Sequence, residues 1–158
     1  MLLSARPGWA QAEALHWGLQ DSAGRGWGLV LFSPADAADP SAWRLRLTLR
    51  TPGLALSHHS PLLLDDGAGH HWQLANCSDE LVAASGALLP VQSAQFDLGG
   101  LLPRPSGALP LHLQVPLDEG VAELMVGAEP VAALSGLPQA GSVQQLPNRR
   151  ASASRNRR

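Results

Sequence analysis

The clearest pattern of hydrophobic and polar positions in this chain lies in residues 43–51, which read WRLRLTLRT. Apolar side chains at positions 43, 45, 47 and 49 alternate with arginine or threonine. A period of two places the apolar side chains on one face of a β-strand and the polar side chains on the other. The segment therefore predicts a strand in an antiparallel sheet that has one face in water.

Two pairs of apolar runs flank turn-forming sequences and predict β-hairpins. Residues 27–32 (WGLVLF) follow the turn sequence DSAGRG, which favours a strand over a short amphipathic helix for residues 12–20. Residues 61–64 and 71–74 flank the sequence DDGAG and predict a second hairpin. Both hairpins agree with an antiparallel arrangement of strands.

The next part of the chain predicts one short helix and three further strands. Residues 78–84 (SDELVAA) favour a helix, since Ser78 suits an N-cap and the two acidic residues that follow suit the positive end of a helix. The strands are expected at residues 95–98, 109–117 and 121–126.

Two prolines bear on the place of the strand at residues 109–117. Pro110 and Pro116 have no N–H to donate to a ladder, so the strand is expected at the edge of a sheet. Its backbone would then be open to another strand only around residues 112–114. We therefore expect partner or dimer contacts to use another edge, or a sheet face that carries exposed tryptophan.

The number and spacing of these segments predict the fold class. About seven short strands at spacings of roughly 10 residues indicate a mainly β fold with at most one or two short helices, either an antiparallel sandwich or a closed barrel. The length of 158 residues fits one domain, predicted at residues 1–134. Residues 135–158 are rich in Gly, Pro, Gln, Ser, Asn and Arg, which predicts a flexible, basic C-terminal tail.

Residues 43–126, read in order, resemble the bacterial immunoglobulin-like domains of the telokin-like type. The segments that carry the resemblance are RLRLTLRT, LLLDDGAGHHW, LHLQVP and AELMV, and residues 99–107 (GGLLPRPSG) loosely match the family's Leu-Pro-Gly-like turn. The resemblance covers about half of the chain. It implies an antiparallel immunoglobulin-like β-sandwich that acts as a non-enzymatic interaction module.

Charge is unevenly distributed along the chain. All 13 acidic residues lie in residues 1–148 together with six arginines, whereas residues 149–158 hold five arginines and no acid. This basic segment is a candidate contact for nucleic acid or for an acidic surface. Its arginines are Arg149, Arg150, Arg155, Arg157 and Arg158. The alternative is a solvated chain end without function.

Three further arginines share the polar face of the strand at residues 43–51. Arg44, Arg46 and Arg50 are candidates for contact with an anion or with nucleic acid. The excess of acidic residues in residues 1–148 opposes long-range attraction of phosphate. The alternative is that these arginines pair with Asp or Glu on neighbouring strands.

No pattern in the sequence points to a metal, a cofactor or a catalytic centre. Histidine pairs at 58–59 and 70–71 lie near the aspartates at 65–66 and supply ligand types that zinc uses, but a hairpin that turns at Gly67 places the pairs well over about 10 Å apart. The nucleophile motif G-x-S-x-G is absent, and the single cysteine, Cys77, has no obvious histidine partner. We therefore expect no enzyme activity, no cofactor and no metal.

The leading hypothesis from the sequence is a non-enzymatic binding or assembly module with an unknown protein partner or a second copy of itself. Two alternatives are nucleic-acid contact through the arginine-rich tail and a small metal- or anion-binding protein that uses the histidine pairs. A lone cysteine, the lack of an apolar run of membrane-spanning length and an N-terminus without the apolar core of a signal peptide predict a cytoplasmic protein with no membrane span.

Overall fold

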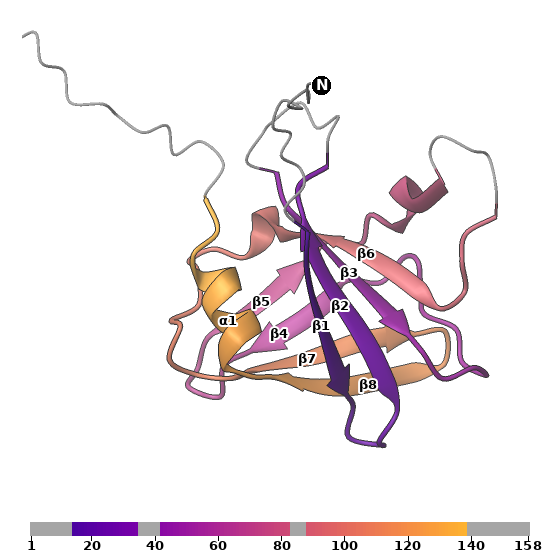
Figure 1. The fold of residues 1–158 in the computed structure, drawn as a ribbon, viewed down its shortest axis with the longest axis horizontal. Coiled ribbons are helices and arrows are strands. Elements are labelled where there is room, and N and C mark those ends of the chain that lie inside the picture. Colours follow the sequence, from indigo (N-terminus) through magenta and orange to yellow (C-terminus); the bar gives the residue numbers. More distant parts are fainter. Residues whose placement is uncertain (1–13, 35–41, 83–87, 139–158) are drawn as a thin grey trace, which may run out of the picture.

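The computed structural model describes residues 14–34, 42–82 and 88–138, and within them the chain forms two antiparallel sheets of four strands each (Figure 1). The first sheet has the order β1 (Leu15–Gln20), β2 (Gly26–Phe32), β3 (Arg44–Leu49), β6 (Ser93–Asp97). The second has the order β5 (His71–Leu74), β4 (Leu62–Asp65), β7 (Leu111–Leu117), β8 (Gly120–Val126). The mainly β, antiparallel fold predicted from the sequence is confirmed.

The alternation in β3 decides which of its side chains enter the core. Leu45, Leu47 and Leu49 are at most 1% exposed, while the alternate residues Arg44, Arg46 and Thr48 face outward. β2 and β6 flank β3 in antiparallel register, so that Leu29 and Ala94, both buried, stand opposite Leu47. Three neighbouring strands therefore present their apolar side chains to the same side.

The core lies between the two sheets and consists mainly of leucine packed around large aromatic side chains. Trp27 and Phe96 are both 0% exposed. The fully buried leucines include Leu29, Leu31, Leu45, Leu47, Leu49, Leu56, Leu62, Leu74, Leu98 and Leu101. Full burial of one such side chain stabilises the fold by about 1.5–3 kcal/mol relative to leaving it exposed.

Helix α1 (Ala128–Ser135) follows β8 and packs on this core, although the sequence pattern did not predict it. Val131 and Leu134 are each 1% exposed. Leu137, which lies in the segment expected to form the flexible tail, is 8% exposed and belongs to the same core. Residues 139–158, with the five tail arginines, lie outside the described residues.

The prediction that residues 109–117 form an edge strand is wrong. β7 lies between β4 and β8 and pairs with both of them. Pro110 precedes the first residue of β7, and Pro116 lies beyond Gln114, the last β7 residue that pairs with β4. The Pro116 carbonyl accepts a 2.9 Å hydrogen bond from the Ser57 N–H. Neither proline interrupts the pairing, and β4 fills the gap that was expected around His112.

The two sheets are joined at both lateral edges. On one side Asp21, after β1, forms an isolated bridge with Leu124 of β8. On the other side Asn76, after β5, forms a bridge with Phe96 of β6. These contacts occupy part of the backbone that an edge strand would offer to a partner.

Two 3₁₀ helices lie beside β6, at Ser78–Val82 and Leu98–Gly100. The first begins where a helix was predicted, and residues 83–84 of that prediction lie outside the described residues. The Ser78 hydroxyl accepts a 3.0 Å hydrogen bond from the Gln95 N–H and so binds β6 instead of capping the helix. In the part of the chain that the structure describes, no helix is long and apolar enough to cross a membrane.

Candidate binding surfaces

His112 lies at the centre of the outer face of the second sheet and contacts a carboxylate on each neighbouring strand. The register places Asp65 of β4 directly opposite His112, while Glu123 of β8 stands diagonally across from it. His112 Nδ1 is 3.1 Å from Asp65 Oδ2, and His112 Nε2 is 2.9 Å from Glu123 Oε1. One side chain thus links three adjacent strands.

This arrangement favours the charged form of His112. The hydrogen bond with Asp65 is the main reason that the pKa of His112 is raised above its ordinary value, and the hydrogen bond with Glu123 adds to it against the opposing effect of burial. Both ring nitrogens donate only in the imidazolium form. Neither nitrogen is then free to accept a proton from another molecule.

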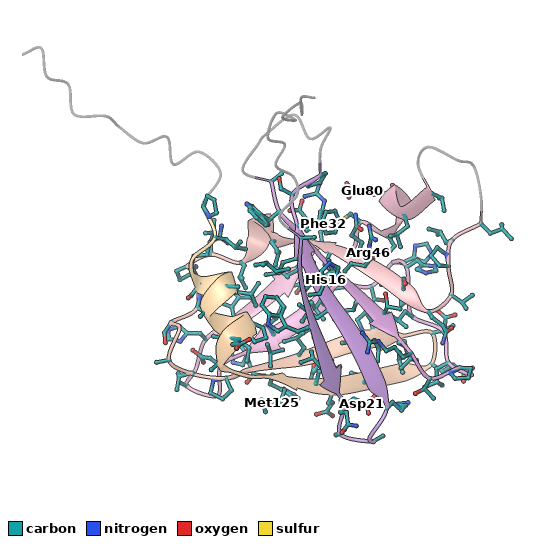
Figure 2. The ribbon with its side chains drawn as sticks, in the orientation of Figure 1. His16, Asp21, Phe32, Arg46, Glu80 and Met125 are labelled. Atoms are coloured by element: carbon teal, nitrogen blue, oxygen red, sulfur yellow. The ribbon has the colours of Figure 1, made fainter. Side chains whose placement is uncertain are left out.

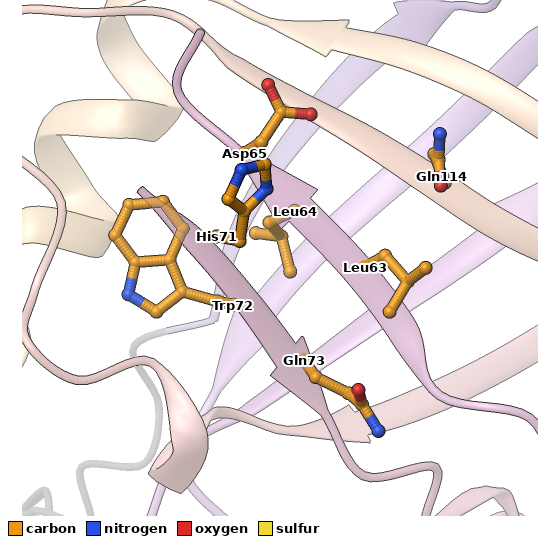
Figure 3. Close-up of a pocket in the computed structure, with 7 residues that line it drawn as sticks. All are labelled: Leu63, Leu64, Asp65, His71, Trp72, Gln73 and Gln114. Atoms are coloured by element: carbon orange, nitrogen blue, oxygen red, sulfur yellow. The ribbon is translucent and has the colours of Figure 1, made fainter. Parts of the chain in front are cut away.

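Beside this cluster the same face is hollowed and partly apolar. A hollow of about 410 Å³ is lined by residues of β4, β5 and β7 (Figure 3): Leu63, Leu64, Asp65, His71, Trp72, Gln73 and Gln114. Leu63 is 40% exposed, and on β8 Val121 and Met125 are 52% and 57% exposed. We call the outward side chains of this sheet the His112 face: Leu63, Asp65, His71, Gln73, His112, Gln114, Val121, Glu123 and Met125.

The outer face of the first sheet carries the three arginines predicted from β3, and we call it the arginine face. Figure 2 shows His16, Phe32 and Arg46 over the strands of this sheet. Arg44 is engaged by carboxylates: its Nε and Nη2 donate to Glu80 at 2.8 and 3.1 Å, and its Nη1 is 3.5 Å from Asp97 Oδ1. The hydrogen bonds to Glu80 raise the pKa of Arg44. Arg44 therefore pairs with acidic side chains, which was the alternative to contact with an external anion.

Arg46 has a different environment from Arg44. Its Nε donates a 3.0 Å hydrogen bond to Gln95 Oε1, and its guanidinium carbon lies 4.9 Å from the centre of the Phe32 ring. Burial lowers the pKa of Arg46. Among the described residues no carboxylate forms an ion pair with it. Contact between Arg46 and an external anion stays a prediction.

Arg50 follows β3 and lies over two glycines. Gly18 and Gly28 are cross-strand partners in β1 and β2. A Cβ atom placed on Gly28 would lie 3.1 Å from Arg50 Nη2, so the guanidinium rests against bare backbone. Contact between Arg50 and an anion also stays a prediction, and the five tail arginines lie outside the described residues.

One histidine of each pair, His58 and His70, contacts groups of its own chain. His58 Nε2 lies 2.9 Å from the carbonyl oxygen of Pro90 and 3.0 Å from that of Ser93. His70 Nδ1 lies 2.7 Å from Asp66 Oδ2, and the His70 ring stacks on Trp72. Within residues 14–34, 42–82 and 88–138, no group of three or more His, Cys, Asp or Glu side chains has the geometry to hold a metal ion.

Cys77 is partly buried, and its surroundings disfavour the thiolate. Burial raises the pKa of the Cys77 thiol to about 12, and the nearby Glu80 carboxylate acts in the same direction. A nucleophilic cysteine requires the opposite shift. The environment of Cys77 is therefore that of an unreactive thiol.

The sequence reasoning did not find the contacts of His112, although part of the signal was present. The alternation in LHLQVPL and in the following strand points His112 and Glu123 to the same outer face. A tight turn at residues 118–119 sets the register between them. Asp65 could not be assigned in this way, because its pairing with His112 joins segments 47 residues apart.

Comparison with known proteins places the chain in a family but assigns it no activity. Neither the curated proteins nor the solved structures contain a match to the chain. No homologue therefore confirms the immunoglobulin-like, telokin-like resemblance. A family model described as "Protein of unknown function (DUF3122)" matches residues 12–133, which is more than half of the chain. The chain belongs to this DUF3122 family.

Proposed function

We propose that this domain is a non-catalytic binding module whose protein partner docks on the His112 face. The observation that carries the proposal is the combination on one sheet face of exposed apolar side chains, a hollow and a fixed pair of carboxylates. Met125 and Leu63 are 57% and 40% exposed, and the hollow of about 410 Å³ lies beside Leu63. Exposed apolar groups of this kind mark surfaces for association when they gather on one face.

The polar centre of the face supports a docking role over a catalytic one. His112 holds Asp65 and Glu123 with both ring nitrogens, so it is not available as a general base. Cys77, with a thiol pKa of about 12, is a poor nucleophile. The fixed carboxylates would orient a partner that carries a basic side chain, because charge complementarity sets the register of an interface.

The partner is expected to present an apolar side chain next to a basic one. The apolar side chain would enter the hollow lined by Leu63, Gln73 and Gln114. The basic side chain would lie over Asp65 and Glu123. Contact through one apolar and one basic side chain fits a transient interface, in which a few buried anchors carry most of the binding energy.

The test compares Met125→Asp with the control substitution Val91→Asp. The Met125 side chain is 57% exposed and that of Val91 59%, and Val91 lies outside the His112 face. Proteins captured by the wild-type domain from the source cell are identified, and the leading partner is purified for direct titration. We expect Met125→Asp and Leu63→Asp to weaken binding at least about tenfold, which corresponds to about 1.4 kcal/mol. We expect Val91→Asp to bind as the wild type does.

Two results would contradict the proposal. One is equal affinity of the partner for the wild type, Leu63→Asp and Met125→Asp. The other is turnover of a small-molecule substrate that is abolished by a single substitution in this face, such as His112→Gln, with the fold intact by circular dichroism.

A further inference from the structure

We propose that the arginine face holds a second, separate binding site, which takes the carboxylate or phosphate group of a small molecule between Arg50 and His16. The floor of this site is the glycine pair Gly18 and Gly28. The site lies on the first sheet, opposite to the His112 face, and does not depend on the docking function proposed above.

The glycine pair lets the Arg50 side chain lie close to the backbone of the sheet. Gly18 and Gly28 stand directly opposite each other in the β1–β2 ladder, so the Arg50 guanidinium can lie directly against the backbone of the sheet at this point. A Cβ atom on Gly28 would lie 3.1, 3.5 and 3.6 Å from Nη2, Nε and Cζ of Arg50, and one on Gly18 would lie 3.7 Å from Nη1. The whole guanidinium therefore rests along the two glycines.

A hollow of about 220 Å³ opens beside this guanidinium. It is lined by Arg50, the two glycines, Val30 and His16, which lies two residues before Gly18 on the same face of β1. Figure 2 shows His16 over the first sheet. The hollow is thus bounded by two side chains that can donate hydrogen bonds to an anion, and its floor is backbone.

Arg50 retains its hydrogen-bonding capacity in the structure. Among the described residues, the other arginines bind carboxylates, an amide or carbonyl oxygens, but no hydrogen bond or ion pair of the Arg50 guanidinium is formed. A guanidinium presents its N–H groups in a planar fork that matches a carboxylate or a phosphate in two parallel hydrogen bonds. Arg50 is accordingly the anchor of the proposed site.

The surrounding charges favour an anion at this position. Arg46 lies four residues before Arg50 on the same face of the sheet. It has no carboxylate partner among the described residues. The acids Glu80 and Asp97 are engaged by Arg44, which lies at the opposite end of β3 from Arg50. An oxyanion in the hollow beside the Arg50 guanidinium would therefore meet a positive field, and partly desolvated charges strengthen such an attraction.

The test is a titration of the full-length protein, labelled with ¹⁵N, with inorganic phosphate in one arm and succinate in the other, at constant ionic strength. We expect saturable shifts of the Gly18 and Gly28 amide signals in at least one arm, and the arm that saturates identifies the anion class. Arg50→Gln should weaken binding at least tenfold. Arg158→Gln, which removes the same charge from the tail, should leave it unchanged.

A substitution that keeps the charge separates this geometry from a general attraction. Gly28→Ala places a methyl group against Arg50 Nη2 and should displace the guanidinium, so that the affinity falls while the net charge is constant. The proposal is overturned if neither anion gives saturable shifts, if Arg50→Gln binds as the wild type does, if Arg158→Gln weakens binding as much as Arg50→Gln, or if Gly28→Ala keeps the wild-type affinity.

Discussion

The indole Nε1 of Trp27 donates a 2.9 Å hydrogen bond to Oδ2 of Asp21, and both side chains are buried. Trp27 is a fully buried core side chain, and Asp21 begins the turn between β1 and β2. The same carboxylate accepts hydrogen bonds from the Ala23 N–H, the Arg25 N–H and Arg25 Nε. The turn is therefore tied to the core through one aspartate.

Asp21→Ala is expected to lower the free energy of unfolding by about 2–4 kcal/mol, because it removes charge-assisted hydrogen bonds and leaves the buried Trp27 N–H without a partner. Urea unfolding followed by tryptophan fluorescence measures the change. Glu119→Ala, at an exposed position of the turn after β7, serves as the control and should change the value by less than about 0.5 kcal/mol. Equal destabilisation by the two substitutions would contradict the assigned role.

The same carboxylate predicts an acid limit to stability. Burial alone would raise the pKa of Asp21, but the hydrogen bonds from Trp27, Arg25 and Ala23 outweigh it and hold the pKa below its ordinary value of 3.8. Asp21 therefore stabilises the fold fully above pH 3.8. This stabilisation is lost as the pH falls through the lower pKa of the folded state. The free energies of unfolding of the wild type and of Asp21→Asn should converge in that acid range. A constant difference down to the lowest pH would count against this account.

Arg104 is expected to hold the C-terminal end of the fold. Its guanidinium donates to the carbonyl oxygens of Leu101 (2.9 Å), Leu137 (3.2 Å) and Pro138 (2.7 Å). Lysine cannot reproduce this fork of donors. Arg104→Lys should lower the free energy of unfolding by about 1–3 kcal/mol and speed hydrogen exchange at the Leu137 amide. Unchanged exchange at Leu137 would show that the contacts do not hold this segment.

The fold elements that could be predicted are those in which the local sequence pattern alone shows which side chains are buried. β3 is such a case, because each Leu in RLRLTL faces the core and each Arg faces water. α1 is the opposite case, since Gly127 directly precedes AEPVAALS and Pro130 lies within it, and both look like helix breakers. Pro130 lies in the first turn of α1, where the N–H has no helical partner to lose, so the proline is tolerated.

The parts that could not be predicted depend on the length and register of distant strands. Pro116 excludes a neighbouring strand only where that strand needs an N–H from the proline. β4 ends its pairing with β7 at Gln114, and beyond it the Pro116 carbonyl accepts a hydrogen bond from the Ser57 N–H, which needs no such donor. The partner of His112 on β4 is likewise set by a long-range register. Arg44, Arg46 and Arg50 were correctly expected on one face, but their different partners arise from β6, Phe32 and Gly28.

Cys77 is expected to react slowly with alkylating reagents. Burial raises the pKa of its thiol to about 12, so the thiolate is scarce near neutral pH. Modification by iodoacetamide should be at least about tenfold slower in the native protein than in the urea-unfolded chain, whose thiol has an ordinary pKa. Mass spectrometry of the alkylated peptide gives both rates, and comparable rates would contradict the assigned environment.

His112 predicts a stability contribution that disappears at alkaline pH. Its pKa is raised in the folded state by the hydrogen bond with Asp65 and, after the opposing effect of burial, by that with Glu123. A histidine whose pKa is raised by folding stabilises the fold fully below its pKa of 6.5 in the unfolded chain. This stabilisation is lost as the pH rises through the pKa of the folded state. The difference in free energy of unfolding between the wild type and His112→Gln should therefore be largest below pH 6.5 and decrease above it. A difference that stays constant or grows with pH would show that His112 is not held as an imidazolium between its two carboxylates.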